Sequence, residues 1–190
     1  MTASWAMALL ILGPLAAAAL AFMFPKRGRW VAGAVAVMAV LALLVLSREV
    51  MANGVQQHRV GGWHAPLGID LRADGLAVLM LGMAALVASA VTLYSPPYFL
   101  AAAGAEARRR AESFWPLFLF LWAALNALFL SADIFNLYVT LELLGFGAVA
   151  LVALAGRREA VGAAMRYLLV SLSASLFYLL GVALVYGQCA

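Results

Sequence analysis

Long blocks of apolar residues alternate with short polar connectors along the chain. Each block has about 20 residues, enough to cross a hydrocarbon core about 30 Å thick as a helix. The blocks lack the alternation of apolar and polar positions that is typical of a transmembrane β-strand. Because every backbone N–H and C=O group in lipid needs a partner within the protein, the pattern predicts transmembrane helices. We expect six spans, at residues 5–24, 30–46, 76–94, 114–130, 134–154 and 163–186.

Polar residues and prolines indicate where some of these spans begin and end. Asp74 is placed to cap the free N–H groups in the first turn of the third span. The run Ser95, Pro96 and Pro97 is expected to end that span. Pro116 is expected in the first turn of the fourth span, where its missing N–H is tolerated.

The longest connector, residues 47–75, joins the second and third spans. Apolar and charged residues alternate over residues 69–72, which favours an extended or interfacial segment. The connector also holds His58 and His64, whose spacing and loop context do not favour a metal site.

The composition agrees with a single membrane domain over residues 1–190. Hydrophobic residues make up 67% of the chain and charged residues 11%, against about 25% charged in ordinary soluble domains. The net charge of +4 lies mostly in short loops, which excludes a basic nucleic-acid-binding surface. No Lys or Arg precedes the first apolar block, so we expect it to be a retained helix and not a cleaved signal peptide.

The basic residues fall mainly on one side of the predicted bundle. Nine of them lie in or next to the connectors after the first, third and fifth spans: Lys26, Arg27, Arg29, Arg108, Arg109, Arg110, Arg157, Arg158 and Arg166. The other side carries Arg48, Arg59 and Arg72. Because cytoplasmic connectors are enriched in Lys and Arg, we expect the larger group in the cytoplasm and the N-terminus outside. Trp30, Trp63, Tyr94 and Trp115 are at predicted span ends, where an aromatic interfacial belt is expected.

Glu142 is the most deeply placed ionisable residue of the predicted spans. It lies nine residues after Asp133, or roughly 13 Å along the helix axis, near the middle of the bilayer. A charge there costs at least about 2.5 kcal/mol, so such a residue usually faces the bundle interior or a hydrated path. Two roles therefore fit Glu142: a proton carrier, and a neutral acid that hydrogen-bonds a neighbouring helix.

Other polar residues of the fifth span are candidates for the same proton path. Asp133 suits the N-cap of this helix and equally a position at proton entry. Asn136 and Thr140 continue from it at helical spacing. Tyr138 precedes Glu142 by four residues and is placed to hydrogen-bond it.

The sixth span adds hydroxyl groups and a cation. Ser171 and Ser175 share one face, where they either hold a file of water molecules or bond carbonyls of their own helix. Arg166 either extends to the cytoplasmic interface or serves as a charge partner on the route to Glu142. Gly145 and Gly147 of the fifth span favour close approach of a neighbouring helix.

The fifth and sixth spans resemble those of a known family. Their sequences are SADIFNLYVTLELLGFGAVALVALAG and AAMRYLLVSLSASLFYLLGVALVYG. They are similar to the fifth and sixth helices of antiporter-like membrane subunits, a family that includes the proton-pumping subunits of NADH:quinone oxidoreductase and the D-type subunit of multisubunit cation/proton antiporters. The stretch PLGIDLRADGLAVLML is similar to the lead-in to the third helix of that family.

The resemblance implies that Glu142 is the key buried acid of a proton path and that the N-terminus lies outside. It also implies other membrane subunits as partners, a bacterial inner membrane as location, and protons as cargo, with Na⁺ or K⁺ as candidate exchanged ions. The path of the family continues through a lysine on the next helix and later buried lysines that these 190 residues do not contain. We therefore expect the chain to be a fragment, a truncated product or one part of a split subunit.

The resulting hypothesis is a membrane subunit for proton translocation or cation/proton antiport. The alternative is a structural membrane subunit of a respiratory, hydrogenase or inorganic-carbon uptake complex, with no ion path of its own. The sequence contains no quinone, flavin, nicotinamide or iron–sulfur motif, so we expect no cofactor and no catalytic site in this chain. Any oxidoreductase activity would belong to the assembly.

Overall fold

The computed structural model describes residues 2–62, 68–101 and 104–189. Within these ranges, six helices are long and apolar enough to cross a membrane. They are α1 (Thr2–Met23), α2 (Gly28–Asn53), α3 (Gly75–Ala101), α4 (Ala105–Leu130), α5 (Ile134–Ala153) and α6 (Arg158–Cys189). The prediction of an all-α membrane bundle of about six spans is confirmed.

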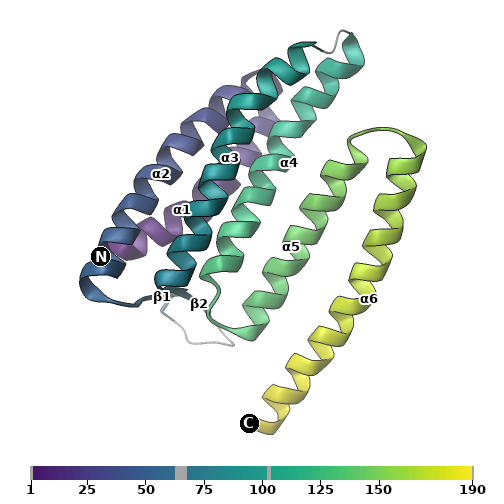
Figure 1. Ribbon diagram of the computed structural model, residues 1–190. Coiled ribbons are helices and arrows are strands. Elements are labelled where there is room, and N and C mark those ends of the chain that lie inside the picture. The colour runs from purple at the N-terminus through teal and green to yellow at the C-terminus, as the bar shows by residue number, and fades with distance from the viewer. Residues whose placement is uncertain (1, 63–67, 102–103, 190) are drawn as a thin grey trace.

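The first four helices form a bundle, and α5 and α6 extend it on one side (Figure 1). Helix α4 packs against α1, α3 and α5, whereas α6 packs mainly against α5. Half of the most apolar segment of α4 is buried, compared with 6% of that of α6. Helix α4 is therefore the central helix, and α6 lies at the edge.

Small residues allow α1 and α2 to approach their neighbours closely. The buried residues of α2 recur at intervals of three and four, so that they form one stripe along the helix: Gly28, Ala32, Val35, Ala39, Ala42 and Leu46. Five of the eight buried residues of α1 are alanine. In lipid, where apolar side chains gain little by leaving the solvent, such close backbone packing supplies much of the attraction between helices.

A proline inside α1 is compensated by an asparagine of α4. Pro14 has no N–H group, so the carbonyl of Leu10, four residues earlier, lacks its helical donor. The side-chain Nδ2 of Asn126 donates to this carbonyl at 2.7 Å. Asn126 is 1% exposed. The hydrogen bond therefore satisfies a backbone group that would otherwise be unpaired in an apolar interior, and it joins α1 to α4.

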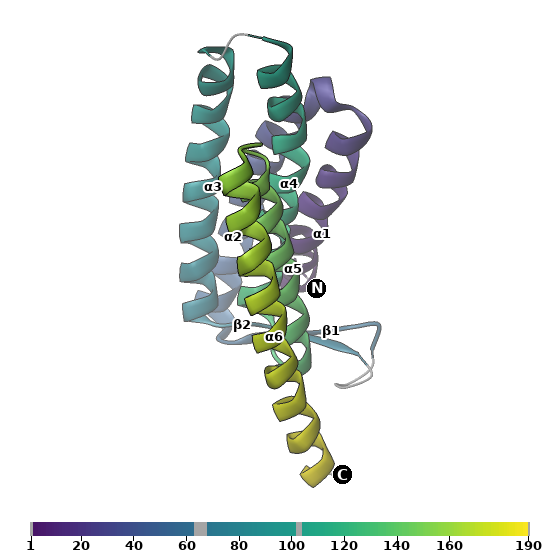
Figure 2. The same cartoon turned by 90° about the vertical axis from the view of Figure 1, so that its right-hand side faces the viewer.

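A β-hairpin lies across one end of the bundle (Figure 2). Strands β1 (Gln56–Val60) and β2 (Ile69–Ala73) pair antiparallel, with His58 opposite Leu71. The N–H of Ala132, in the turn between α4 and α5, donates to the carbonyl of Asp70 at 3.0 Å. The extended segment expected at residues 69–72 is confirmed, and it holds the turn that precedes α5.

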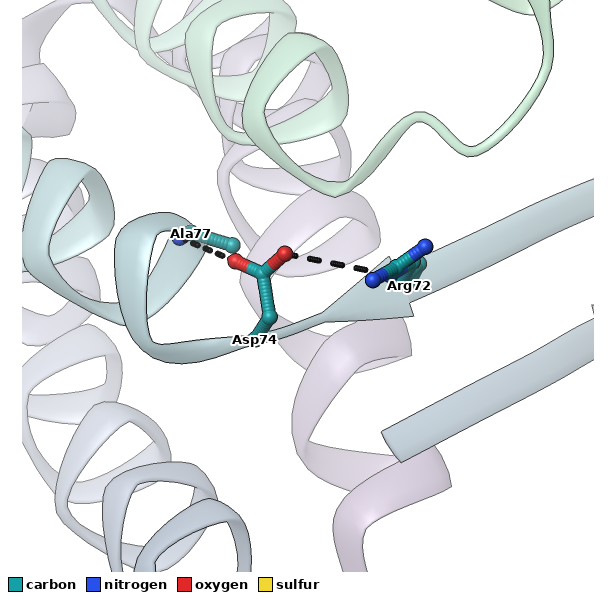
Figure 3. A network of polar contacts seen from close by, with 3 residues as sticks. All are labelled: Arg72, Asp74 and Ala77. Atoms are coloured by element: carbon teal, nitrogen blue, oxygen red, sulfur yellow. Dashed lines mark hydrogen bonds and ion pairs between the residues drawn. The ribbon is translucent and has the colours of Figure 1, made fainter. Parts of the chain in front are cut away.

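Asp74 begins α3 in the way its sequence position predicts (Figure 3). Its Oδ1 accepts a hydrogen bond from the N–H of Ala77 at 2.9 Å, and its Oδ2 lies 3.8 Å from Nε of Arg72. The capping bond satisfies one of the free N–H groups of the first turn. Both charged side chains are partly exposed, so the ion pair itself contributes little to stability.

Several predicted helix ends are wrong. Helix α2 runs on to Asn53, past the expected end at residue 46, and α6 begins at Arg158, before the expected start at residue 163. Helix α3 continues through Pro96 and Pro97 to Ala101, because a membrane helix can absorb the loss of two backbone donors when its neighbours support it. Helix α4 begins at Ala105, so Pro116 lies well inside it and not in its first turn. A 3-10 turn, η1 (Pro25–Arg27), joins α1 to α2.

The early start of α4 makes its basic segment helical. Arg110 Nη2 lies 2.6 Å from Oε1 of Glu106, one helical turn earlier. Such a pair, together with an acidic residue in the first turn, favours the helix over the connector that we expected there.

The aromatic residues at the span ends divide into two groups. Trp30 and Tyr94 are 70% and 69% exposed, as expected for an interfacial belt. Trp115 is only 5% exposed and packs in the core, so its assignment to the belt is wrong. The cause is Gly28, because a Cβ atom there would lie 2.8 Å from Cβ of Trp115. Trp63 lies outside the described residues.

We expect Asn126→Ala to lower the free energy of unfolding by about 1–2 kcal/mol, because it leaves the Leu10 carbonyl buried without a donor. Unfolding of the purified chain by titration with a denaturing detergent, followed by circular dichroism, measures this loss.

The control is the same substitution in a Pro14→Ala background. The alanine introduced there supplies an N–H group to the carbonyl of Leu10, so Asn126→Ala should cost less in this background than in the natural chain. Equal costs in the two backgrounds would show that the asparagine stabilises the bundle in some other way.

Candidate functional site

Glu142 lies near the middle of α5. It is the ninth residue of a 20-residue helix, which is about 30 Å long at 1.5 Å per residue. Its side chain is half-buried in the chain. The helix bounds therefore place Glu142 near the centre of α5 along its axis.

Helix α5 presents two different faces to its two neighbours. Thr140 and Gly147 are buried, and Gly147 lies against Phe120 and Leu121 of α4. Asp133 and Asn136 precede Thr140 at helical spacing on this same side. Glu142 belongs to the other face, because it lies four residues from Tyr138 and three from Gly145, both of which contact α6.

Two contacts set the register between α5 and α6. The rings of Tyr138 and Tyr178 stack with centroids 6.1 Å apart and planes 10° from parallel. A Cβ atom at Gly145 would lie 3.7 Å from Oγ of Ser171. Because the helices are antiparallel, Glu142 is level with the segment of α6 between Ser171 and Tyr178, which includes Ser175.

The facing residues of α6 form one seam. Buried and half-buried positions recur at intervals of four and three along the helix: Ala164, Leu168, Ser171, Ser175, Tyr178 and Val182. Ser175 donates to the carbonyl of Leu172 at 2.9 Å, so it adopts the simpler of the two roles expected for it. Ser171 leaves its hydroxyl beside Gly145.

Asp133 is the N-cap of α5. Its Oδ1 accepts a hydrogen bond from the N–H of Asn136 at 2.7 Å. Its Oδ2 is also buried, and it has no hydrogen-bond partner among the described residues. One carboxylate oxygen is thus explained by helix capping, and the other is available to water or a proton.

Two contacts that the sequence suggested for Glu142 are not formed. No hydrogen bond joins Tyr138 to Glu142 in the described part of the chain, since the tyrosine ring instead stacks on Tyr178. Arg166 is exposed on α6. By the register above it is eight residues from the level of Glu142, or about 12 Å along the axis. A distance of this size excludes a direct ion pair.

Thr140 is also separated from Glu142. Its Oγ1 donates to the carbonyl of Leu137 at 2.9 Å, and its side chain is 3% exposed, on the side of α4. The candidate path residues therefore form two groups: Tyr138, Glu142, Ser171 and Ser175 at the α5–α6 seam, and Asp133, Asn136 and Thr140 on the side of α4.

Sequence reasoning assigned no functional position to Asn126 or Tyr178. A polar residue within an apolar span is the signal that points to Asn126. Tyr178 follows Ser175 by three residues, on the same face of α6, and its hydroxyl donates to the carbonyl of Ile134 at 3.3 Å. His58 lies in β1 and His64 outside the described residues. The described ranges contain no cluster of three metal-ligating side chains.

No protein-family model matches the chain. It is 38% identical over 162 residues to NADH-quinone oxidoreductase subunit N of Desulforudis audaxviator, covering 85% of this chain and 31% of the relative. It is 34% identical over 188 residues to a probable K(+)/H(+) antiporter D-type subunit of Rhizobium meliloti, covering 93% of this chain and 33% of the relative.

The fold is similar to a subunit in the structure of the Mrp complex from Dietzia sp. DQ12-45-1b, with a TM-score of 0.81 and 27% identity. That match covers 99% of this chain and 35% of the subunit. The chain thus spans about a third of the length of the proteins that it matches.

We expect Gly147→Ala to give a protein that is less stable than Gly145→Ala by about 1–3 kcal/mol, the usual cost of overpacking. A Cβ at Gly147 would lie 3.2 Å from Leu121 Cδ1 and 3.3 Å from Phe120 Cδ1, whereas at Gly145 its nearest neighbour is at an ordinary 3.7 Å. The gain in helix propensity is the same in both variants and cancels. Detergent unfolding of the two proteins measures the difference, and equal stabilities would contradict the close α4–α5 contact.

Proposed function

Because the chain belongs to the family of antiporter-like membrane subunits, we propose that it is part of a subunit for proton translocation or cation/proton antiport, with Glu142 as its proton carrier. The observation that carries the proposal is the position of Glu142, at the middle of an apolar helix and on the face that meets a second helix with hydroxyl groups. The relatives named above support protons as the cargo, with Na⁺ or K⁺ as candidate counter-ions.

The surroundings of a buried carboxyl group decide whether its neutral acid or its carboxylate is favoured, and this balance underlies the proposed proton-carrying role of Glu142. Removal from water favours the neutral acid, and a nearby cation favours the carboxylate. Desolvation is supplied by α5 and α6 and by the surrounding lipid.

The cation that favours the carboxylate comes from outside α5 and α6. Arg166, the only basic residue within the apolar part of either helix, is exposed and about two turns from the level of Glu142. A cation on another segment of the subunit, or on a neighbouring subunit, would approach Glu142 at the open edges of the α5–α6 pair.

Two sets of polar residues lead toward Glu142. Asp133 has a buried carboxylate oxygen with no partner among the described residues, and with Asn136 and Thr140 it supports proton entry along the α4 side of α5. Ser171, Ser175 and Tyr138 support transfer along the α5–α6 seam. Water between these side chains would connect the two groups.

We place the protein in a bacterial inner membrane, with other membrane subunits as partners and the N-terminus outside. The topology follows from the basic end of the bundle, where the α1–α2, α3–α4 and α5–α6 connections lie (Figure 1), because such ends are retained in the cytoplasm. The hairpin and the α4–α5 turn then face the outside, so that Asp133 lies at the entry side.

Glu142→Gln should lower proton flux at least tenfold, while the protein remains in the membrane. The amide has nearly the shape of the acid but cannot release a proton. Flux is measured with a pH-sensitive dye in vesicles that contain the assembled subunit, and assembly is measured by co-purification of its partners.

Glu159→Gln is the matched control, because Glu159 is an exposed acid in the first turn of α6. It should retain full flux. If Glu142→Gln retains full flux as well, Glu142 serves packing, and the alternative of a structural subunit gains support.

The topology predicts that a membrane-impermeant maleimide labels a Cys189→Ser/Gln57→Cys variant in intact spheroplasts, because Gln57 is exposed in β1 at the end opposite the basic connections. In a Cys189→Ser/Glu106→Cys variant, labelling should require permeabilisation, since residue 106 lies at the basic end. The reverse pattern would place the N-terminus in the cytoplasm.

A further inference from the structure

A basic cleft of about 1110 Å³ opens at the basic end of the bundle. Three parts of the chain enclose it: η1 together with the start of α2, the end of α3, and the first turns of α4. Its charged lining residues are Lys26, Arg29, Arg108, Arg109 and Glu112. Four cations against one acid give the lining a formal charge of +3.

The four cations lie on the surface, and one of them, Arg29, lies over the ring of Trp30 at 5.0 Å from its centroid. All four side chains are exposed, and none forms an ion pair with a carboxylate in the part of the chain that the structure describes. This contrasts with Arg110, which is engaged with Glu106 outside the cleft lining. Cations without a carboxylate partner that converge from two separate chain segments can contact the several oxygens of one phosphate group.

The floor of the cleft is firmly packed. Trp115, which lines the cleft, is 5% exposed and lies directly against Gly28, where a Cβ would approach to 2.8 Å. This contact holds the start of α2 against α4. It therefore fixes Lys26 and Arg29 relative to Arg108 and Arg109 before any ligand binds, which lowers the entropic cost of binding.

Apolar and aromatic side chains surround the same end of the bundle on its outer surface. Six of them are more than half exposed: Phe22, Met23, Phe24, Trp30, Tyr94 and Tyr98. They lie within about two helical turns of the cleft residues in sequence. Exposed Trp and Tyr residues at this position are typical of the boundary between lipid tails and headgroups.

We infer that this cleft binds the headgroup of an anionic phospholipid, whose acyl chains lie along the exposed apolar surface of the adjoining helices. The phosphate contacts the cations of η1, α2 and α4. Glu112 is the acid among the lining residues and disfavours a second, closely spaced anion. A free anion would use only the cations, whereas a phospholipid uses the cations and the apolar rim together.

Native mass spectrometry of the purified full chain in mild detergent tests this inference, with phosphatidylglycerol as the probe. One phosphatidylglycerol molecule should remain bound at concentrations at which phosphatidylcholine does not. Arg108→Gln/Arg109→Gln should weaken retention at least tenfold. Lys26→Gln/Arg29→Gln should do the same from the opposite wall, which guards against a folding defect in either variant.

The matched control is Arg157→Gln/Arg158→Gln, which removes the same charge at the same end of the molecule but outside the cleft. It should change retention less than twofold. Equal losses in the control and the cleft variants, or equal retention of phosphatidylcholine, would overturn the site. Full displacement of phosphatidylglycerol by an equal concentration of inorganic phosphate would overturn the lipid as its occupant.

Discussion

The hydrogen bond from Asn126 to the carbonyl of Leu10 is the contact on which the arrangement of the bundle depends. Lipid offers no donors, so the carbonyl that Pro14 leaves unpaired must find one inside the protein. A side chain of another helix supplies it here, because Asn126 donates to this carbonyl from the C-terminal part of α4. The bond sets the height and rotation of α4 relative to α1. Because α5 packs on α4, it also sets the level of Glu142.

Close packing then carries this placement outward from the bundle centre. Gly28 brings the start of α2 onto Trp115 of α4, and Gly147 brings α5 onto Phe120 and Leu121 of the same helix. At each of these points a single Cβ atom would force the helices apart. The hairpin adds a second constraint, because Asp70 of β2 holds the N–H of Ala132 just before α5 begins. Helix α5 is thus held at its N-terminal end by the hairpin and along one face by α4.

Local signals in the sequence were enough to predict the parts of this structure that depend on local physics. The apolar blocks predicted the helices, and Asp74 and Asp133 predicted the caps that the structure contains. The end of α3 and the start of α4 were mispredicted from Pro96, Pro97 and Pro116. Whether a helix tolerates a proline depends on what packs beside it, and the local sequence does not show those neighbours. The same holds for Trp115, whose burial is caused by a glycine 87 positions away in the chain.

The candidate site shows the same division. Depth along α5 is a count of residues, so the position of Glu142 near the helix centre could be predicted. The split between its polar neighbours could not, because it depends on which face of α5 meets α4 and which meets α6. Thr140 and Glu142 are two residues apart, about 200° around the helix, and they face different neighbours.

That split constrains how a proton could move. A path that stays on one helix face would use either the Asp133, Asn136 and Thr140 side or the Glu142 side, but not both. A path from Asp133 to Glu142 must pass around α5, which requires water beside a helix whose most apolar segment is only 17% buried in the chain. Helix α6 covers one side of that route, and the register leaves Ser171 beside Gly145, where the helix surface is lowest. Since a carboxylate at mid-membrane depth is tolerated only with water or a cation near it, the segment or subunit that covers the remaining edge of the α5–α6 pair must be polar at the level of Glu142.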